Sequence, residues 1–536
     1  MQTKMTILSL CFIISVPLVC KSQAPGIAWQ KSFGGSEDDG ALSIVQTADS
    51  GFISAGFSES TDGDVTVNHG MTDAWIIKTD SNGNLQWQKS YGGSFDDVLV
   101  YISVTSDGGY IAAGYTFSFD GDVSGNHGEN DFWVIKLDSA GNLQWQKCYG
   151  GTSYDQALFL RQTFDGGYVV TGYAASINGN VTNNHGYEDS WVVKLDNSGN
   201  LQWQKCLGGS AYDLGVACYQ TADSGYIVSG LSESDDGDVS GNHGGDDAWI
   251  IKLDASGSIE WQKCLGGTSE DELKIFPTSD GGYFGTGQTD SDDGDVSGIH
   301  GGIDAWIVKL DSAGNLLWQK CLGGSGSEES SDYANSGYEN ADGSYIVSAI
   351  SSSTDGDVAG NHGGEDYWIT SVDESGNFLW QKCLGGSNDE ETFSVMPAIS
   401  GGYIVCGYSD SNDGDVTGNH GNYDAWVVRL EFGIPSGVVQ ENNTTNEVTV
   451  LISPNPFSDK SSIQFSLSQR SQVTIELHDI GGRKLQIISN EMFSEGDHQI
   501  SFSDEKLLPG IYFLQLKTDH QVVSKKLIVI SKGIEG

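Results

Sequence analysis

The 536-residue chain has little proline, with 8 residues, and few basic residues, with 26 Lys and Arg against 73 Asp and Glu. The low proline count together with 73 glycines argues against a disordered linker protein and suits many tight turns between short strands. The formal net charge of −47 makes nucleic acid and anionic membrane poor partners and cations good ones. Beyond the N-terminus no apolar run reaches about 18 residues, so we expect no internal membrane span.

Short catalytic signatures are also missing. The sequence contains no G-x-S-x-G, no zinc-binding H-E-x-x-H and no phosphate-binding loop. Cysteine is sparse, and five of the nine occupy one recurring position: Cys148, Cys206, Cys264, Cys321 and Cys383. Equivalent positions in neighbouring repeats lie too far apart for a disulfide, so we expect small buried apolar side chains.

What the chain does have is a regular spacing of its 14 tryptophans. Seven follow one another in W-Q-K segments at intervals of 57 to 62 residues: Trp29, Trp87, Trp145, Trp203, Trp261, Trp318 and Trp380. The other seven lie in D-x-W segments: Trp75, Trp133, Trp191, Trp249, Trp306, Trp368 and Trp426. A fixed period over seven copies indicates one supersecondary unit repeated seven times.

Each repeat is predicted to contain four strands. In the copy that starts at Trp87, the later strands are expected at Val98–Thr105, Tyr110–Tyr115 and Phe132–Leu137, joined by glycine turns and one long polar loop. Seven such units predict an all-β, seven-bladed β-propeller over residues 23–431, with tryptophans packed between blades. A linear solenoid is the alternative, but it needs atypical capping repeats, and the end copies are ordinary.

The two ends of the repeat region complement each other. The region begins with a lone W-Q-K strand, Ile27–Phe33, and ends with a D-x-W strand, Asp424–Leu430. The first strand is therefore predicted to complete the last blade, which removes an exposed sheet edge. Trp29 is expected to lie in the same sheet as Trp426.

Two motifs within the repeat resemble known bacterial propeller repeats. They are D-G-G-Y-I/V-x-x-G, as at Asp107–Gly114, and D-x-x-G-N-L-x-W, as at Asp138–Trp145. The second is similar to the tryptophan-docking turn of quinoprotein propellers and to bulb-type lectin repeats. The resemblance covers about ten residues per repeat and implies a blade, not a quinone cofactor or mannose.

The long loop of each repeat is acidic and carries a D-G-D segment before the D-x-W aspartate. Oxygen-rich loops of this kind suit Ca2+, although the match to an EF-hand is weak and the same acids can bond their own turn backbone. The predicted Ca2+ ligands are Asp62, Asp64, Asp73, Asp120, Asp122, Asp131, Asp236, Asp238, Asp247, Asp293, Asp295, Asp304, Asp355, Asp357, Asp366, Asp413, Asp415 and Asp424. The third copy departs from the pattern, with Asn178 and Asn180 in place of the acid pair.

Two further polar residues recur once per repeat. Seven histidines follow the D-G-D segment, and a structural role in the loop is favoured over zinc, because no second His or Cys stands nearby. A second acid opens the innermost strand, near the mouth of the central channel, where it caps the incoming backbone or joins a ring that holds a cation or shapes a ligand pocket. This set is predicted as Asp39, Asp97, Asp155, Asp213, Asp271, Asp332 and Glu390, with an insertion in the sixth copy moving the position to Asp332.

The chain ends carry sorting information. Residues 1–22 read as a secretory signal peptide, residues 432–446 as a linker, and residues 447–536 as an immunoglobulin-like β-sandwich. The series Ser453–Phe457, Gly482–Leu485, Leu508–Leu514 and Ser524–Val529 resembles the type A C-terminal sorting domain of the Bacteroidota type IX secretion system. That resemblance implies export through the periplasm to the cell surface or the medium, with the secretion machinery as a partner.

The favoured function is a surface or secreted binding module whose acidic loops bind Ca2+ and a glycan or protein ligand. The alternatives are an enzyme that acts on extracellular polysaccharide and a purely structural envelope protein. Near-identical loops argue against a single active site, because catalysis needs different groups that converge on one point. The insertion near Ser325–Ser336 makes the sixth blade the place to look for asymmetric ligand contacts.

Overall fold

The structure is a computed structural model that describes residues 23–329, 337–432 and most of 450–529. Within the last range, residues 454–459, 468, 479–483, 504–506, 508–509 and 519–521 lie outside the described residues. The predicted signal peptide and nearly all of the predicted linker also lie outside them. The described parts form 36 strands and no helix, and they hold no helix that could cross a bilayer.

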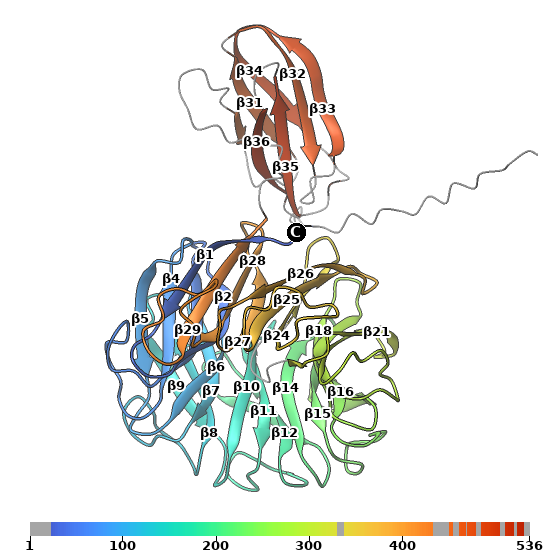
Figure 1. Cartoon of the computed structure of the whole chain (residues 1–536). Coiled ribbons are helices and arrows are strands. Elements are labelled where there is room, and N and C mark those ends of the chain that lie inside the picture. The colour runs from blue at the N-terminus through green and yellow to red at the C-terminus, as the bar shows by residue number, and fades with distance from the viewer. Residues whose placement is uncertain are drawn as a thin grey trace, which may run out of the picture.

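Seven sheets of four strand positions build the repeat region (Figure 1). Each sheet is one blade, with consecutive strands paired antiparallel. The first five blades are β2–β5 (Asp39–Gln46, Phe52–Ser58, Asp73–Thr79, Leu85–Tyr91), β6–β9 (Asp97–Val104, Tyr110–Thr116, Asp131–Leu137, Leu143–Tyr149), β10–β13 (Asp155–Gln162, Tyr168–Ala174, Asp189–Leu195, Leu201–Leu207), β14–β17 (Asp213–Gln220, Tyr226–Ser232, Asp247–Leu253, Ile259–Leu265) and β18–β21 (Asp271–Pro277, Tyr283–Thr289, Asp304–Leu310, Leu316–Leu322).

The sixth blade departs from this pattern. Its innermost position is divided between β22 (Glu328–Glu329) and β23 (Gly337–Glu339), both paired with β24 (Tyr345–Ser351), and β25 (Asp366–Val372) and β26 (Phe378–Leu384) follow. The insertion seen in the sequence therefore interrupts the innermost strand of this blade.

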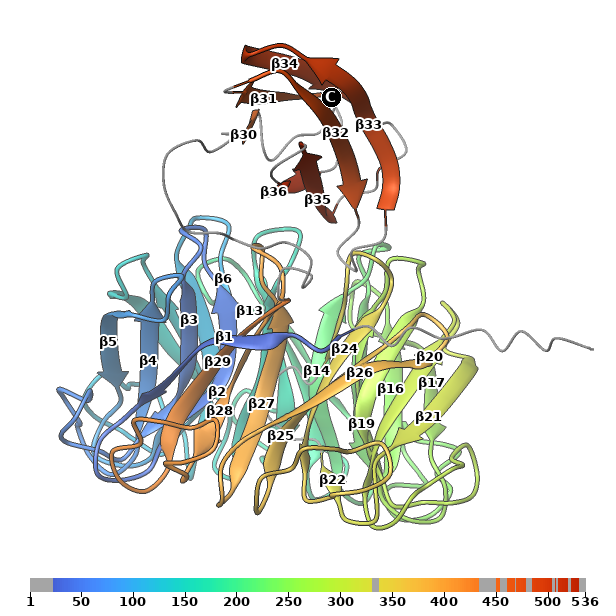
Figure 2. The same ribbon diagram turned by 45° about the horizontal axis from the view of Figure 1, so that its top comes forward.

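The seventh blade joins the two ends of the repeat region. It consists of β27 (Glu390–Pro397), β28 (Tyr403–Ser409), β29 (Asp424–Glu431) and, as its outer strand, β1 (Gly26–Phe33). Figure 2 shows β1 beside β29. In the register of these two strands, Ser32 pairs with Trp426. Trp29 and Trp426 thus lie on paired strands, and Trp426 Nε1 donates to Gln30 Oε1 at 2.8 Å.

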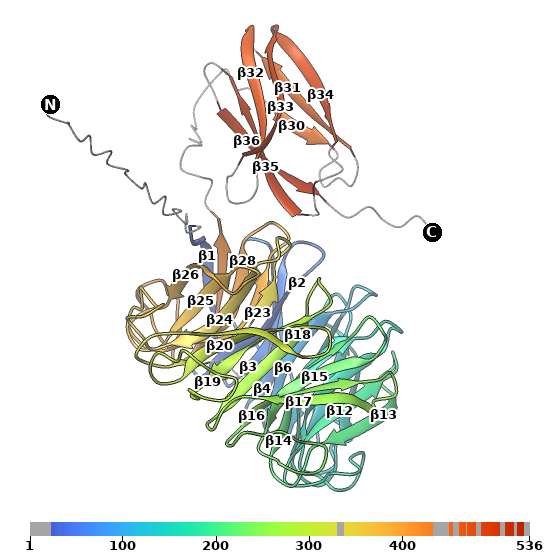
Figure 3. The same cartoon turned by 90° about the vertical axis from the view of Figure 1, so that its right-hand side faces the viewer.

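The innermost strands line a central channel, and neighbouring blades pack on one another around it. β2 contacts both β6 and β27, so the first blade lies against the second and the seventh (Figure 3). This arrangement is a seven-bladed β-propeller, which is the predicted fold class. The strands predicted for the second repeat are confirmed to within one residue at each end.

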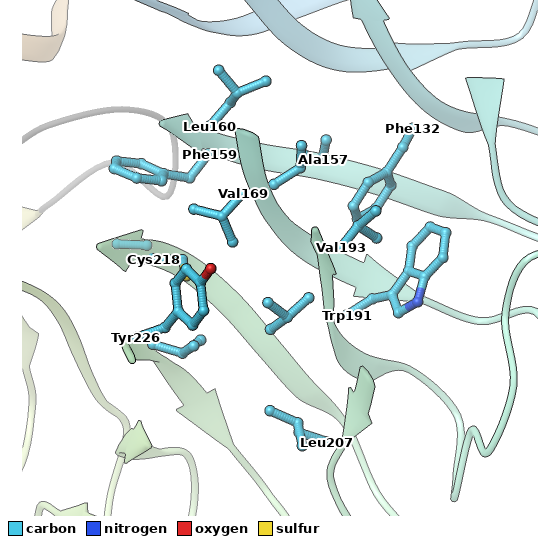
Figure 4. Packing of buried hydrophobic residues seen from close by; sticks show 14 of the residues in the cluster. Phe132, Ala157, Phe159, Leu160, Val169, Trp191, Val193, Leu207, Cys218 and Tyr226 are labelled. Carbon is cyan, nitrogen blue, oxygen red and sulfur yellow. The ribbon is translucent and has the colours of Figure 1, made fainter. Parts of the chain in front are cut away.

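The tryptophans of the D-x-W segments form the centre of the packing between blades. All seven are at most 1% exposed, and each indole N–H donates to a glutamine on the neighbouring outer strand of its own blade. Trp191 packs edge-on against Phe132 of the preceding blade, with ring centroids 4.5 Å apart (Figure 4). Burial of an indole removes on the order of 150–250 Å2 from water, which joins the blades. All seven cysteines of residues 23–432 are free and buried, which confirms the prediction for the five that follow the W-Q-K segments.

The C-terminal region consists of two sheets. One contains β30 (Val450–Ser453), β31 (Ser461–Leu467) and β34 (Gly496–Phe502), and the other contains β33 (Lys484–Phe493), β32 (Ser471–His478), β35 (Gly510–Lys517) and β36 (Val522–Val529). Ile463 and Phe465 from the first sheet share one hydrophobic core with Val473 and Leu514 from the second. The region is therefore a β-sandwich, and its immunoglobulin-like topology stays a prediction.

Candidate functional site

The first acid of each D-G-D segment accepts a hydrogen bond from a backbone N–H and, in the described part of the chain, does not pair with another acid. Asp62 is exposed, and its Oδ1 accepts the N–H of Ser36 at 2.8 Å. Asp120, Asp236, Asp293, Asp355 and Asp413 accept the matching N–H at 2.7–2.8 Å. In the third copy Asn178 Oδ1 accepts the same bond from Thr152 at 3.0 Å. Because the uncharged Asn178 side chain accepts the same hydrogen bond, this position stabilises the turn whether or not it carries a charge.

The D-x-W aspartates are fully buried and bind the histidine four residues earlier. Asp73 Oδ2 accepts the backbone N–H of His69 at 2.8 Å and lies 2.6 Å from His69 Nδ1. The same pairing recurs in the other six copies. The histidines therefore have the predicted structural role, since each fixes the end of its long loop.

The acid that opens each innermost strand, here called the inner acid, caps the crossing from the previous blade. Asp39 Oδ2 accepts the N–H of Gly35 and the hydroxyl of Ser60, both at 2.7 Å. The N–H of Asp39 donates to the carbonyl of Tyr423 in the seventh blade. The inner acids therefore tie each blade to the one before it.

The prediction of Asp332 as the sixth inner acid is wrong. Glu328 accepts the N–H of Gly324 at 2.8 Å and the hydroxyl of Ser351 at 2.7 Å, as the other inner acids do. It stands ten residues after Trp318, at the same spacing as in the other copies. The insertion falls after this position, and Asp332 lies outside the described residues.

Two buried carboxyl groups from consecutive blades meet at each boundary between blades, here called a junction. At the junction of the second and third blades, a Cβ built on Gly150 would lie 2.6 Å from Asp131 Oδ1 and 2.7 Å from Asp155 Oδ2. Only glycine leaves room there for both groups. Within the described residues, the Oδ1 atoms of all seven D-x-W aspartates are buried and accept no hydrogen bond: Asp73, Asp131, Asp189, Asp247, Asp304, Asp366 and Asp424.

Burial makes the junctions electrostatically unfavourable for charge. It raises the pKa of Asp131 to about 6, and repulsion from Asp155 acts in the same direction, against the hydrogen bond from His127. Burial likewise raises the pKa of Asp97 and of Asp424 to about 6.

The three predicted calcium ligands of one repeat lie at two different junctions. The N–H of Asp64 donates to the carbonyl of Gly34, beside Asp424 and Asp39, whereas Asp73 is near Asp97 of the next blade. Each junction brings together the D-x-W aspartate of one repeat and the D-G-D segment of the next. For example, His300 pairs with Asp304 through Nδ1 and lies 4.0 Å from Asp357 of the next repeat through Nε2. Among the described residues, no three His, Cys, Asp or Glu side chains form a group that could hold a metal ion.

A separate cavity of about 560 Å3 lies at one mouth of the central channel, here called the channel pocket. It opens on the face that carries the long loops. Its apolar walls include two aromatic pairs, Tyr115 with Phe117 at 6.1 Å between ring centroids and Phe393 with Tyr408 at 5.1 Å. The complete lining is Leu42, Phe57, Glu59, Thr72, Asp96, Val98, Tyr115, Phe117, Gln288, Glu329, Ile350, Glu391, Phe393 and Tyr408.

The inner acids, which were predicted to hold a cation or shape a ligand pocket, are not among the residues that line the channel pocket, which is built from positions that vary between repeats. The penultimate residue of the second strand is Phe57 in the first blade and Gln288 in the fifth. Glu329 and Ile350 come from the sixth blade, where asymmetric contacts were expected. The available signal was the set of repeat positions at which the copies disagree.

The far end of the innermost strand β10 carries a cation. Arg161 lies over the rings of Tyr101, Phe159 and Tyr219, with distances of 5.7, 5.7 and 5.3 Å to their centroids. Such contacts are favourable where the guanidinium has lost water. This end of the channel is therefore occupied by packed side chains.

Comparison with known proteins gives one family match. Residues 451–530 match the model of the secretion system C-terminal sorting domain. A curated relative, the regulatory protein FlaEY of Caulobacter vibrioides, is 28% identical over 164 residues, which cover 28% of this chain and 17% of that protein. The chain thus spans about a sixth of that relative's length.

Several solved structures are similar at low identity. BBS1N in complex with ARL6DN is 8% identical with a TM-score of 0.41, covering 76% of this chain and 97% of that chain. PorZ, a surface component of the type IX secretion system of Porphyromonas gingivalis, is 10% identical with a TM-score of 0.27, covering 88% and 65%. Puromycin hydrolase is 11% identical with a TM-score of 0.43, covering 83% and 62%.

Proposed function

Since residues 451–530 are a type IX secretion C-terminal sorting domain, which directs the chain to the cell surface or the extracellular space, we propose that its propeller is a binding module that holds its ligand in the channel pocket. The sorting domain accounts for the secretion machinery as a partner.

The observation that carries the proposal is the channel pocket. Its volume of about 560 Å3 falls within the range of about 300–1,000 Å3 that small-molecule sites occupy. Aromatic walls provide flat surfaces for the apolar faces of a sugar, and carboxylates such as Glu391 accept hydrogen bonds from hydroxyl groups. A glycan unit is therefore a suitable ligand, with a side chain of a surface protein as the alternative.

A glycan-array screen of the full chain tests this proposal. We expect binding that is lost in Tyr115→Leu and kept in Tyr173→Leu, because Tyr173 has the same strand position in the third blade and is not among the lining residues. Binding unaffected by Tyr115→Leu would reject the pocket. Cleavage of a bound oligosaccharide would favour the enzyme alternative, and a negative array would favour a structural envelope protein.

Calcium at the junctions is the second part of the proposal. Two observations support it: carboxylates from two repeats approach one another, and a buried oxygen on each D-x-W aspartate accepts no hydrogen bond. Ca2+ prefers oxygen ligands, so it would offset the repulsion there, with backbone carbonyls and water as further ligands. The junction between the second and third blades is poorest in acid, because Asn178 and Asn180 replace the pair.

Thermal unfolding of the full chain with and without millimolar Ca2+ tests this part. We expect Ca2+ to raise the melting temperature, and the double substitution Asn178→Asp with Asn180→Asp to enlarge the increase. The matched control is Asp311→Asn, in an exposed turn that lies away from the junctions. An increase that also appears with Mg2+, or none at all, would reject specific calcium binding.

A further inference from the structure

All charged side chains that line the channel pocket are acidic. Its polar lining includes Glu59, Asp96, Glu329 and Glu391, and none of its lining residues is Lys, Arg or His. These acids come from the sixth, seventh, first and second blades, which follow one another around the ring, so they line one side of the mouth. A ligand in the pocket therefore meets negative potential along that side.

The acids are held close together on one side. Thr72 Oγ1 donates to Glu59 Oε1 at 3.4 Å, and the N–H of Thr72 donates to Asp96 Oδ1 at 3.3 Å. Burial raises the pKa of Glu59, and repulsion from Asp38 and Asp96 adds to the rise. A positive group placed among these carboxylates would relieve their repulsion.

The aromatic groups stand next to the acids. The hydroxyl of Tyr408 donates to Glu391 Oε2, and the Tyr408 ring packs on Phe393. In the second blade, the rings of Tyr115 and Phe117 pack on each other, and the N–H of Phe117 donates to the carbonyl of Asp96 at 2.9 Å. Aromatic faces carry negative potential, so they attract cations in the same way as carboxylates, but with less competition from water.

From this combination we infer that the channel pocket selects a small protonated or quaternary amine, either free or as the amino group of a sugar. The inference rests on the proposed function and names the ligand class of the same pocket. A neutral sugar would use the aromatic walls but leave several carboxylates without a countercharge. An anionic sugar would be repelled both by the pocket and by the net charge of −47.

Calorimetric titration of the full chain with matched probes tests the inference. Glucosamine, glucose and N-acetylglucosamine share one ring and differ in the substituent at one carbon, which carries a positive charge only in glucosamine. Choline supplies the cation without the ring. We expect glucosamine to bind about tenfold more tightly than glucose, since one cation–π contact and one ion pair together supply about that factor. Choline binding without glucosamine binding would identify a free amine as the ligand.

Substitutions that remove single carboxylates test whether the amine binds beside them. Glu391→Gln and Glu59→Gln remove charge and keep shape, and each should weaken glucosamine binding several-fold while leaving glucose binding unchanged. Glu233→Gln is the matched control, because Glu233 follows the second strand of the fourth blade as Glu59 follows that of the first, and it does not line the pocket. Unchanged melting temperatures show that the variants fold.

The outcomes separate the inference from the proposed function. Equal affinity for glucose and glucosamine, lost in Tyr115→Leu, would overturn the amine inference and leave the binding module standing. Amine binding that survives Glu391→Gln and Glu59→Gln would place the amine elsewhere and also overturn the inference. If no probe binds and the glycan array is negative, both fall.

Discussion

Replacing Gly150 with alanine should destabilise the propeller at one junction. The new Cβ would lie 2.6 Å from Asp131 Oδ1 and 2.7 Å from Asp155 Oδ2, closer than any ordinary contact between carbon and oxygen. Gly150 does not adopt a positive φ, so the backbone itself tolerates alanine. The effect therefore reports the crowding of the two carboxyl groups alone.

The size of the effect follows from what must move. Asp155 Oδ2 accepts bonds from Gly151 at 2.8 Å and from Ser176 at 2.7 Å, and Asp131 is held by His127. Overpacking costs about 1–3 kcal/mol, and weakening one buried hydrogen bond adds about 1 kcal/mol, so we expect a loss of about 3 kcal/mol. With an unfolding entropy of about 2.1 cal/mol/K per residue over roughly 400 residues, the melting temperature should fall by about 3–4 °C.

Differential scanning calorimetry on the full chain measures this shift. Gly26→Ala is the matched control, because a Cβ there meets nothing within 4 Å, and it should leave the melting temperature unchanged. Adding Asp131→Ala to Gly150→Ala should make the two effects non-additive, since the clash is relieved. If Gly150→Ala and the wild-type chain have the same melting temperature, the two carboxyl groups are not crowded against residue 150, and the prediction is wrong.

Three further predictions concern charge and redox state. Burial raises the pKa of Asp97, Asp131 and Asp424 to about 6, so the folded state binds more protons than the unfolded chain between about pH 4 and 6. The free energy of unfolding should therefore rise as pH falls from 8 to 5. A melting temperature that falls over this range at fixed ionic strength would contradict this prediction. Lys136→Met should lower the free energy of unfolding in urea by about 1–2 kcal/mol. The reason is that the buried Lys136 Nζ donates to Asp107 at 3.0 Å and to the carbonyl of Leu137 at 3.1 Å. An unchanged urea midpoint would show that these bonds do not stabilise the fold. The buried thiols of residues 23–432 are free, so a reducing agent should not change the melting temperature, and a decrease would reveal a disulfide.

Much of the fold was predictable because the repeat supplies the same evidence seven times. The turn Asp107–Gly109 and the burial of the D-x-W tryptophans recur in the sequence with a fixed period. A strand position that is ambiguous in one copy is settled by the others. The pairing of β1 with β29 was predictable for a related reason, since each end of the region held the part that the other lacked.

The C-terminal sandwich was harder to predict. The strands Val450–Ser453 and Lys484–Phe493 were not predicted as strands. Lys484–Phe493 is mostly exposed, so it shows no buried alternation of apolar residues. Without that alternation, hydrophobic periodicity gives no signal for an edge strand.

The grouping of the acids could not be predicted from sequence neighbours. Asp62, Asp64 and Asp73 stand in one loop, yet the loop runs from one junction to the next, and its two ends serve different partners. Glu328 was missed because the inserted residues were placed before it rather than after it. The residues that line the channel pocket could not be predicted from the shared repeat pattern, because they include positions, such as those of Tyr115 and Gln288, where the copies differ.

The pairing of β1 with β29 also constrains how the propeller can fold. Gln30 and Trp426 are bonded across 396 residues, so the seventh blade forms through a very large loop closure, and such non-local pairing slows folding. While the chain is incomplete, β1 has an unsatisfied edge, and so does any blade that lacks its fourth strand. Two nascent copies can satisfy these edges in one another, so exchange of the leading strand between molecules is the characteristic misassembly to which this architecture is exposed.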